Sequence, residues 1–155
     1  MLALRDWEQQ RYLYAGRAIY DVLAPAQRVA WAASLLRFCA AQCPPVQVID
    51  DVLALVDSPP QWTRAHKAFQ NVRDLTLAVD QAPQAFDRRL GSLLDVTENT
   101  AKVIYNASGS PAPFDYDAGW RLGPCLQRFL FDVNDAASTA EGMELFFAPV
   151  DGSAA

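Results

Sequence analysis

Apolar residues recur at helical spacing along most of the chain, and prolines separate the apolar segments. A period of about 3.6 residues is typical of helices that bury one face in a core. Proline fits the first turn of a helix and disrupts its interior, so the prolines mark helix boundaries. The pattern predicts seven helices: Asp6–Leu23, Pro25–Gln42, Val46–Val56, Pro60–Asp80, Asp87–Ala107, a helix from Asp115 or Asp117 to Val133, and Ala136–Phe147.

Evidence for β-strands is poor, because no segment alternates cleanly over six residues and no Asn-Gly or Asp-Gly turn joins two apolar runs. Short connections favour antiparallel neighbours. We therefore predict an all-α fold, an irregular antiparallel bundle of six or seven helices in a single domain. Residues 1–134 are expected to form its body, and residues 135–155 an acidic segment with a weak helix and then a flexible tail. Gly123 and Pro124 are expected to kink or split the sixth helix.

The second predicted helix is apolar on two nearly opposite sides. Val29 and Leu36 belong to one stripe, and Trp31, Leu35 and Phe38 make the other. A helix that is apolar nearly all round is either central in a core or exposed to a partner. We take Trp31, Leu35 and Phe38 as candidate partner-binding residues, either for another protein or for a second copy of the chain.

The net charge of −5 is unevenly distributed along the sequence. Up to Phe131 the basic and acidic residues balance, whereas five acidic residues and no Lys or Arg follow from Asp132 onward. A neutral body with an acidic end argues against nucleic-acid binding and against an anionic membrane surface. It favours a basic protein partner, with Glu141 and Glu144 among the predicted contacts.

The composition indicates a globular, intracellular type of protein. No apolar run approaches the roughly 20 residues that cross a bilayer, and the first residues do not resemble a signal peptide. We therefore expect a cytoplasmic location. Three cysteines at no framework spacing fit reduced thiols, and the excess of Arg over Lys is typical of a bacterial, GC-rich source.

The segment from Phe114 to Arg121 holds the densest group of functional residue types. Asp115 and Asp117 alternate with aromatic Tyr116, and Trp120 follows shortly after. One interpretation is a recognition site with Trp120 as an anchor. The other is a helix start, where an aspartate accepts amide hydrogens of the first turn and the aromatic rings pack beneath it.

A second candidate is a polar pocket on the fourth predicted helix. His66 and Arg73 fall within the apolar stripe of that helix, and Tyr105 comes from the next helix. A histidine there could perform acid–base chemistry, or it could simply hydrogen-bond to backbone at the edge of the stripe. The pocket hypothesis leads to an alternative function, a small enzyme or ligand-binding protein.

The motifs that usually carry catalysis or metal binding are absent from the sequence. Cys39 and Cys43 share a helix face, but no second pair of ligands completes a metal site. Asp50 and Asp51 diverge by about 100° on a helix and do not form a carboxylate pair. There is no Glu-x-x-His, no phosphate-binding glycine loop and no Gly-x-Ser-x-Gly. We predict no metal, no cofactor and no enzymatic activity.

These observations favour a protein-binding function. In its small size, helical content and acidic charge, though in no motif, the chain is similar to bacterial immunity and antitoxin-type proteins. That similarity implies a protein that binds a basic toxin and occludes its active site. A homo-oligomeric scaffold, with the second helix as a homodimer seam, is a further alternative.

Overall fold

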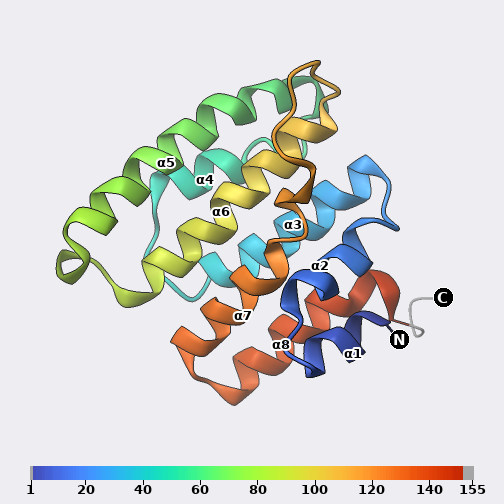
Figure 1. The fold of residues 1–155 in the computed structure, drawn as a ribbon. Helices are drawn as coiled ribbons and strands as arrows, with labels where there is room; N and C mark the ends of the chain where they lie inside the picture. Colours follow the sequence, from blue (N-terminus) through green and yellow to red (C-terminus); the bar gives the residue numbers. More distant parts are fainter. Residues whose placement is uncertain (1, 152–155) are drawn as a thin grey trace.

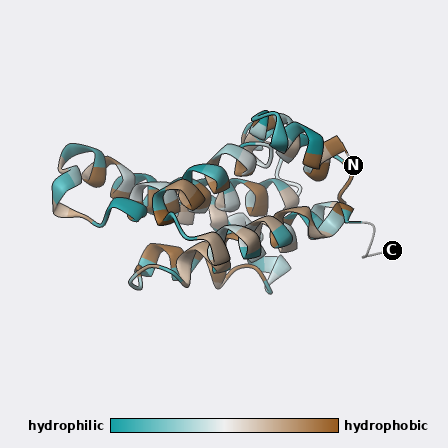
Figure 2. Ribbon diagram, turned by 90° about the horizontal axis from the view of Figure 1, so that it is seen from below, coloured by the Kyte–Doolittle hydropathy of each residue, from teal (hydrophilic) through white to brown (hydrophobic). Residues whose placement is uncertain are grey.

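The computed structural model describes residues 2–151, and within them the chain forms eight α-helices and no β-strand (Figure 1). The all-α prediction is confirmed. The helices are α1 (Leu2–Glu8), α2 (Tyr12–Tyr20), α3 (Pro25–Ala40), α4 (Gln47–Leu53), α5 (Ala65–Gln81), α6 (Arg88–Ala107), α7 (Leu122–Val133) and α8 (Ala136–Phe147). Short 3-10 segments lie before α5, α6 and α7 and after α8. The outer helices carry hydrophobic and hydrophilic residues in alternating bands (Figure 2).

The first predicted helix is in fact two helices. Gln10 has a positive φ of 62°, which ends α1 and redirects the chain into α2. The break brings Trp7 and Tyr12 edge to face, with ring centroids 4.8 Å apart, and Trp7 also packs against Phe146 of α8. Neither Gly nor Pro marks this break in the sequence. We attribute it to the packing of Trp7 against Phe146 of α8, which overrides the local helical pattern.

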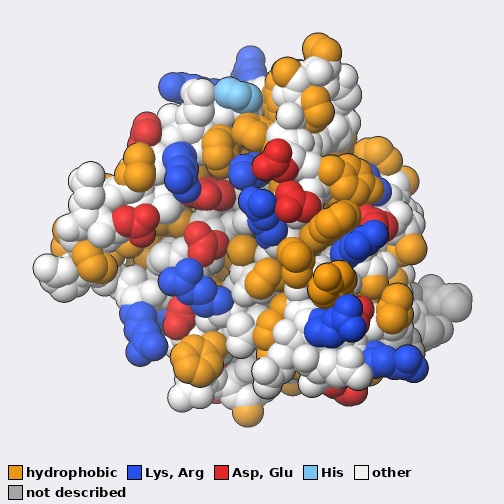
Figure 3. Space-filling model, viewed as in Figure 1, with side chains coloured by type: hydrophobic (Ala, Val, Ile, Leu, Met, Phe, Trp, Pro, Cys, Tyr) orange, Lys and Arg blue, Asp and Glu red, His pale blue; other side chains and the backbone are white. Residues whose placement is uncertain are grey.

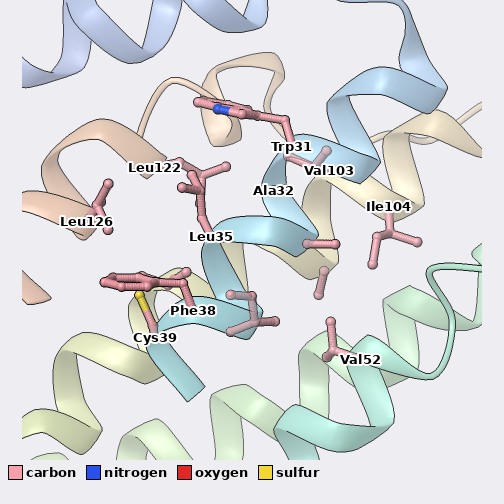
Figure 4. Packing of buried hydrophobic residues seen from close by; sticks show 14 of the residues in the cluster. Trp31, Ala32, Leu35, Phe38, Cys39, Val52, Val103, Ile104, Leu122 and Leu126 are labelled. Carbon is pink, nitrogen blue, oxygen red and sulfur yellow. The ribbon is translucent and has the colours of Figure 1, made fainter. Parts of the chain in front are cut away.

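Helix α3 is the centre of the core, and α6 and α8 both pack against it. Trp31, Leu35 and Phe38 are all buried, and Leu35 is fully inaccessible. The prediction that these three residues form an exposed, partner-binding face is wrong, because the chain's own helices cover both apolar sides of α3. Figure 4 shows Leu35 and Phe38 among side chains that include Leu122 and Leu126 of α7.

Helix α8 lies where the sequence predicts it and belongs to the core. The indole Nε1 of Trp31 donates a hydrogen bond to the carbonyl oxygen of Phe146 (3.0 Å), and the Phe146 side chain is fully buried. The acidic segment is thus held against α3 through Phe146 rather than standing apart from the body. The part of the predicted flexible tail that falls on residues 152–155 lies outside the described residues.

Helix α7 starts later than predicted and has no kink at Pro124. It begins at Leu122, so Pro124 lies in its first turn, where a missing N–H leaves no intrahelical bond unmade. Gly123 lies against α2, and a Cβ at this position would collide with the carbonyl oxygen of Tyr12. Helices α2 and α7 therefore approach one another more closely than any larger residue would permit.

Candidate functional site

The predicted recognition segment forms the short 3-10 turn Tyr116–Ala118 and the approach to α7. Neither Asp115 nor Asp117 caps a helix through its side chain, so the capping interpretation is wrong. Asp117 instead pairs with Arg121 at 3.2 Å, whereas Asp115 is exposed. Tyr116 is 51% exposed, which places it on the molecular surface as a recognition residue would be.

Trp120 is held at the junction with α2 by a hydrogen bond and a cation-π contact. Its Nε1 donates a hydrogen bond to Asp21 Oδ1 (2.8 Å), and the Arg17 guanidinium lies 4.8 Å from the centre of its ring. Arg17 also pairs with Asp21 at 3.5 Å. These contacts give Trp120 a structural role in joining α7 to α2, and its side chain is only partly buried.

The candidate pocket residues are only partly brought together. The ring of His66 stacks on Phe114 and lies edge to face with Tyr105, each at 5.3 Å between centroids. Tyr105 shares a hydrogen bond with Ser110 (2.7 Å), and Arg73 reaches away to pair with Glu98 (3.6 Å). His66 is therefore the exposed edge of a partly buried aromatic cluster, and Arg73 does not converge on it.

A row of polar side chains on α6 faces α5 and α7. Glu98 accepts a hydrogen bond from Thr76 (2.7 Å), Asp95 pairs with Arg128 (3.1 Å), and Ser92 donates to Asp132. Burial raises the pKa of Asp95 although Arg128 lowers it in part. On the surface seen in Figure 3, acidic and basic side chains are interspersed. Because each carboxylate has a partner, the row fixes the packing of α6 and leaves no free acid–base pair.

The cysteines are unsuited to nucleophilic chemistry. Burial raises the pKa of the Cys125 thiol to about 12 and also raises the pKa values of Cys39 and Cys43. A thiol with a raised pKa stays protonated and is a weak nucleophile and a weak metal ligand. Within residues 2–151 no group of three or more His, Cys, Asp or Glu side chains is placed to hold a metal ion.

A wide groove runs between α7 and α8 and is closed at one end by the α1–α2 turn. Its volume is about 760 Å³. We call it the α7–α8 groove, and its lining residues are Trp7, Tyr12, Gln127, Leu130, Phe131, Asn134, Asp135, Ala136, Thr139, Ala140 and Met143. None of these is a lysine or an arginine. The groove combines apolar and aromatic side chains with three uncharged polar residues, Gln127, Asn134 and Thr139, and one carboxylate.

Phe131 is the most exposed aromatic residue in the groove, at 68%. It lies on α7 opposite the buried side of that helix, where Phe129 and Leu130 pack inward. Burying a phenylalanine stabilises by roughly 1.5–3 kcal/mol relative to leaving it in water, so Phe131 has a favourable free energy to gain from a partner.

The sequence analysis missed this groove. Three consecutive apolar residues from Phe129 to Phe131 cannot all face one side of a helix, and this excess was a signal that one of them is exposed. The positions of Trp7 and Tyr12 beside it depend on the α1–α2 break, which no local sequence feature marks.

Two exposed acids are next in sequence to groove residues. Glu8 follows Trp7 at the end of α1, and Glu144 follows Met143 on α8. Both are exposed, and neither forms an ion pair within the described part of the chain. Asp135 accepts a hydrogen bond from the backbone N–H of Ser138, which lowers its pKa and keeps the carboxylate ionised. Glu141 is likewise exposed, further round α8.

Comparisons with known proteins add no assignment: no protein-family model, no curated protein and no solved structure matches the chain. Among residues 2–151, no helix combines the length and the apolar character that a membrane span requires.

Proposed function

We propose that this protein binds a basic, amphipathic helix of another protein in the α7–α8 groove. The observation that carries the proposal is an exposed apolar groove whose lining contains aromatic residues and an aspartate but no lysine or arginine. Amphipathic helices bind such grooves through apolar side chains at helical spacing. Tyr, Trp, Phe and Met are the residues that enrich interface cores.

The dimensions of the groove fit a helix of a few turns. Helix α8 has 12 residues, which correspond to a length of about 18 Å. Its Ala136, Thr139, Ala140 and Met143 all line the groove and lie on one helix face. A partner helix of about three turns can therefore lie along α8 and cover Phe131.

The charges around the groove favour a basic partner. Asp135 lines the groove, and Glu8 and Glu144 are exposed next in sequence to the groove residues Trp7 and Met143. Carboxylates without an ion-pair partner attract cations from a distance of about a Debye length. Such charges mainly raise the association rate and select partners of opposite sign. Apolar contacts with Phe131 and Met143 would then supply most of the affinity.

The test uses a designed peptide of about 14 residues that carries leucines on one helix face and lysines on the other. We expect it to bind the wild-type protein, and Phe131→Ala to weaken binding about tenfold or more, as expected for an interface anchor. Leu77→Ala is the matched control, because Leu77 is also exposed, at 48%, but lies on α5. Fluorescence anisotropy of the labelled peptide measures both effects.

Three results would contradict the proposal. A peptide with glutamates in place of lysines could bind equally well, which would remove the charge argument. Phe131→Ala could bind as tightly as Leu77→Ala, which would remove the groove. Light scattering could show a dimer that Phe131→Ala dissociates, in which case a second copy of the chain occupies the groove.

We further propose an immunity- or antitoxin-like role as the concrete form of this function, since such a protein must bind and occlude a basic toxin. We expect a toxin gene beside the gene for this chain. Coexpression of the two should relieve the growth arrest, and Phe131→Asp should abolish that relief while Leu77→Asp preserves it. A neighbouring toxin whose activity this chain leaves unchanged would overturn the role and leave peptide binding to be judged separately.

A further inference from the structure

A second, smaller cavity lies between the start of α3, the end of α6 and the segment that precedes the Tyr116–Ala118 turn. Its volume is about 250 Å³. Val103, Ala107 and Phe114 form apolar walls, and Tyr20, Arg28 and Tyr116 form a polar side. The cavity is slightly smaller than the roughly 300 Å³ at which pockets for drug-sized ligands begin, so it suits a small molecule.

Arg28 is held rigidly at the edge of this cavity. Its Nε donates to the carbonyl oxygen of Tyr20 (3.0 Å), and its Nη2 donates to Tyr116 Oη (2.9 Å). Its guanidinium lies 4.1 Å from the centre of the Tyr20 ring and 5.3 Å from that of Tyr116. These two hydrogen bonds use fewer than half of the N–H donors of a guanidinium.

Arg28 also lacks the partner that most arginines of this protein have. Eight of the eleven arginines pair with a carboxylate of the described chain. Of the remaining three, Arg5 and Arg64 are exposed, whereas Arg28 is half-buried. A partly desolvated cation with unused donors and a fixed orientation binds an anion more strongly than a solvated one does.

The two tyrosines complete a site for a carboxylate. Because Tyr116 Oη accepts from Arg28, its own O–H hydrogen is free to donate elsewhere. Burial raises the pKa of Tyr20, so its hydroxyl stays protonated at neutral pH. A planar carboxylate matches the forked donors of a guanidinium, and hydrogen bonds to charged groups are about twice as strong as neutral ones.

The walls of the cavity are preformed. Asn106 donates to the carbonyl oxygen of Phe114 (3.2 Å) and accepts from its backbone N–H (2.8 Å). The Tyr20 ring packs directly against Gly119, where a Cβ would collide with it. The absence of a side chain at Gly119 therefore fixes the position of the Tyr20 ring in the cavity wall. A preorganised site loses less conformational entropy when a ligand binds.

We propose that this cavity binds a small carboxylic acid with an apolar body. The carboxylate is bound by Arg28 and Tyr116, and the body packs against Val103, Ala107 and Phe114. The site is separate from the α7–α8 groove, so its ligand can bind whether or not a partner protein occupies that groove.

The experiment is an NMR titration of the full chain with benzoate and, as a neutral control of the same shape, benzamide. We expect benzoate to bind with a dissociation constant on the order of 1 mM and benzamide at least tenfold more weakly. The amide signals of Val103 and Ala107 should shift with benzoate. A titration with 4-methylpentanoate, an acid with an aliphatic body, should give the same pattern.

Variants locate the binding. Arg28→Met should abolish benzoate binding, and Arg64→Met, the matched loss of an exposed and unpaired arginine, should leave it unchanged. Tyr116→Phe keeps the exposed ring and should weaken binding about tenfold, which keeps the test valid if Arg28→Met does not fold. The proposal is overturned if benzamide binds as tightly as benzoate, if neither acid shifts Val103 and Ala107, or if Tyr116→Phe and Arg28→Met bind like wild type.

Discussion

Phe146 is the residue whose removal tests most directly whether the acidic C-terminal helix belongs to the core. Its side chain is fully buried, and its ring contacts Trp7 at 5.1 Å, Phe147 at 5.0 Å and Trp31 at 5.5 Å between centroids. Phe146→Ala therefore removes one side of an aromatic cluster that joins α1, α3 and α8. Substitutions of this type cost about 3–5 kcal/mol.

That cost is large relative to the total free energy of unfolding of the domain. A domain of this size is stable by roughly 5–15 kcal/mol, and for 150–250 residues each kcal/mol shifts the melting temperature by about 2–4 °C. We expect Phe146→Ala to lower the melting temperature by about 6–20 °C. Thermal unfolding followed by circular dichroism at a helix band measures it, and urea unfolding gives the free energy independently.

Phe131→Ala is the control, since it is the same chemical change at a position that is 68% exposed. Substitutions on the surface usually change the free energy of unfolding by less than about 0.5 kcal/mol. If Phe146→Ala and Phe131→Ala destabilise equally, α8 is not part of the core and the burial of Trp31 beneath it is wrong. Trp31→Phe should show an intermediate loss of about 1–3 kcal/mol, because it removes the hydrogen bond to Phe146 and leaves space where the larger indole packed.

Two further predictions concern a helix cap and a helix contact. Asp87 caps α6 and is paired with Arg89, which lowers the pKa of its carboxyl group to about 2. The carboxylate therefore stabilises the folded state fully above pH 3.8, the pKa of an unperturbed aspartate, and this stabilisation is lost as the pH falls towards 2. Asp87→Ala should lower the free energy of unfolding by about 1 kcal/mol at neutral pH, and urea titrations should show this difference disappear between pH 3.8 and about 2; a constant difference would contradict the cap. Gly123→Ala should destabilise by about 1–3 kcal/mol because its Cβ meets Tyr12, whereas Gly91→Ala in α6, with open space around it, should stabilise by up to about 1 kcal/mol. Equal effects of the two alanines in thermal unfolding would show that α2 and α7 are not in close contact.

The sequence predicts the long helices well and the packing between them poorly. The limits of α8 agree with its prediction, and α6 differs by one residue at its start. An aspartate caps each of these helices, Asp87 at α6 and Asp135 at α8. The break at Gln10 carries no such mark. It exists because Trp7 and Tyr12 pack together over α8, and contacts between distant segments are not visible in local propensity.

The same distinction explains the error at Trp31, Leu35 and Phe38. Periodicity shows how many faces of a helix are apolar, but it does not show what covers each face. Helix α8 covers the second face of α3, yet its own sequence is weakly periodic and acidic, which indicated a peripheral segment. Its buried Gly142 and Phe146, rather than its charges, determine where it packs.

The distribution of charge likewise changes when the chain folds. In the sequence, the basic residues before Asp132 balance the acidic ones and the excess negative charge follows; in the structure, Arg88 pairs with Asp132 across α6 and α7. Net charge per segment therefore does not identify the groups that remain available for binding. The groups that matter are those without an ion-pair partner that also line a cavity, among them Asp135 in the α7–α8 groove and the half-buried guanidinium of Arg28. The first is anionic in a wide groove, and the second is cationic at a small cavity, so they select ligands of opposite charge and different size. Phe131→Ala should therefore affect only binding in the groove, and Arg28→Met only binding in the small cavity.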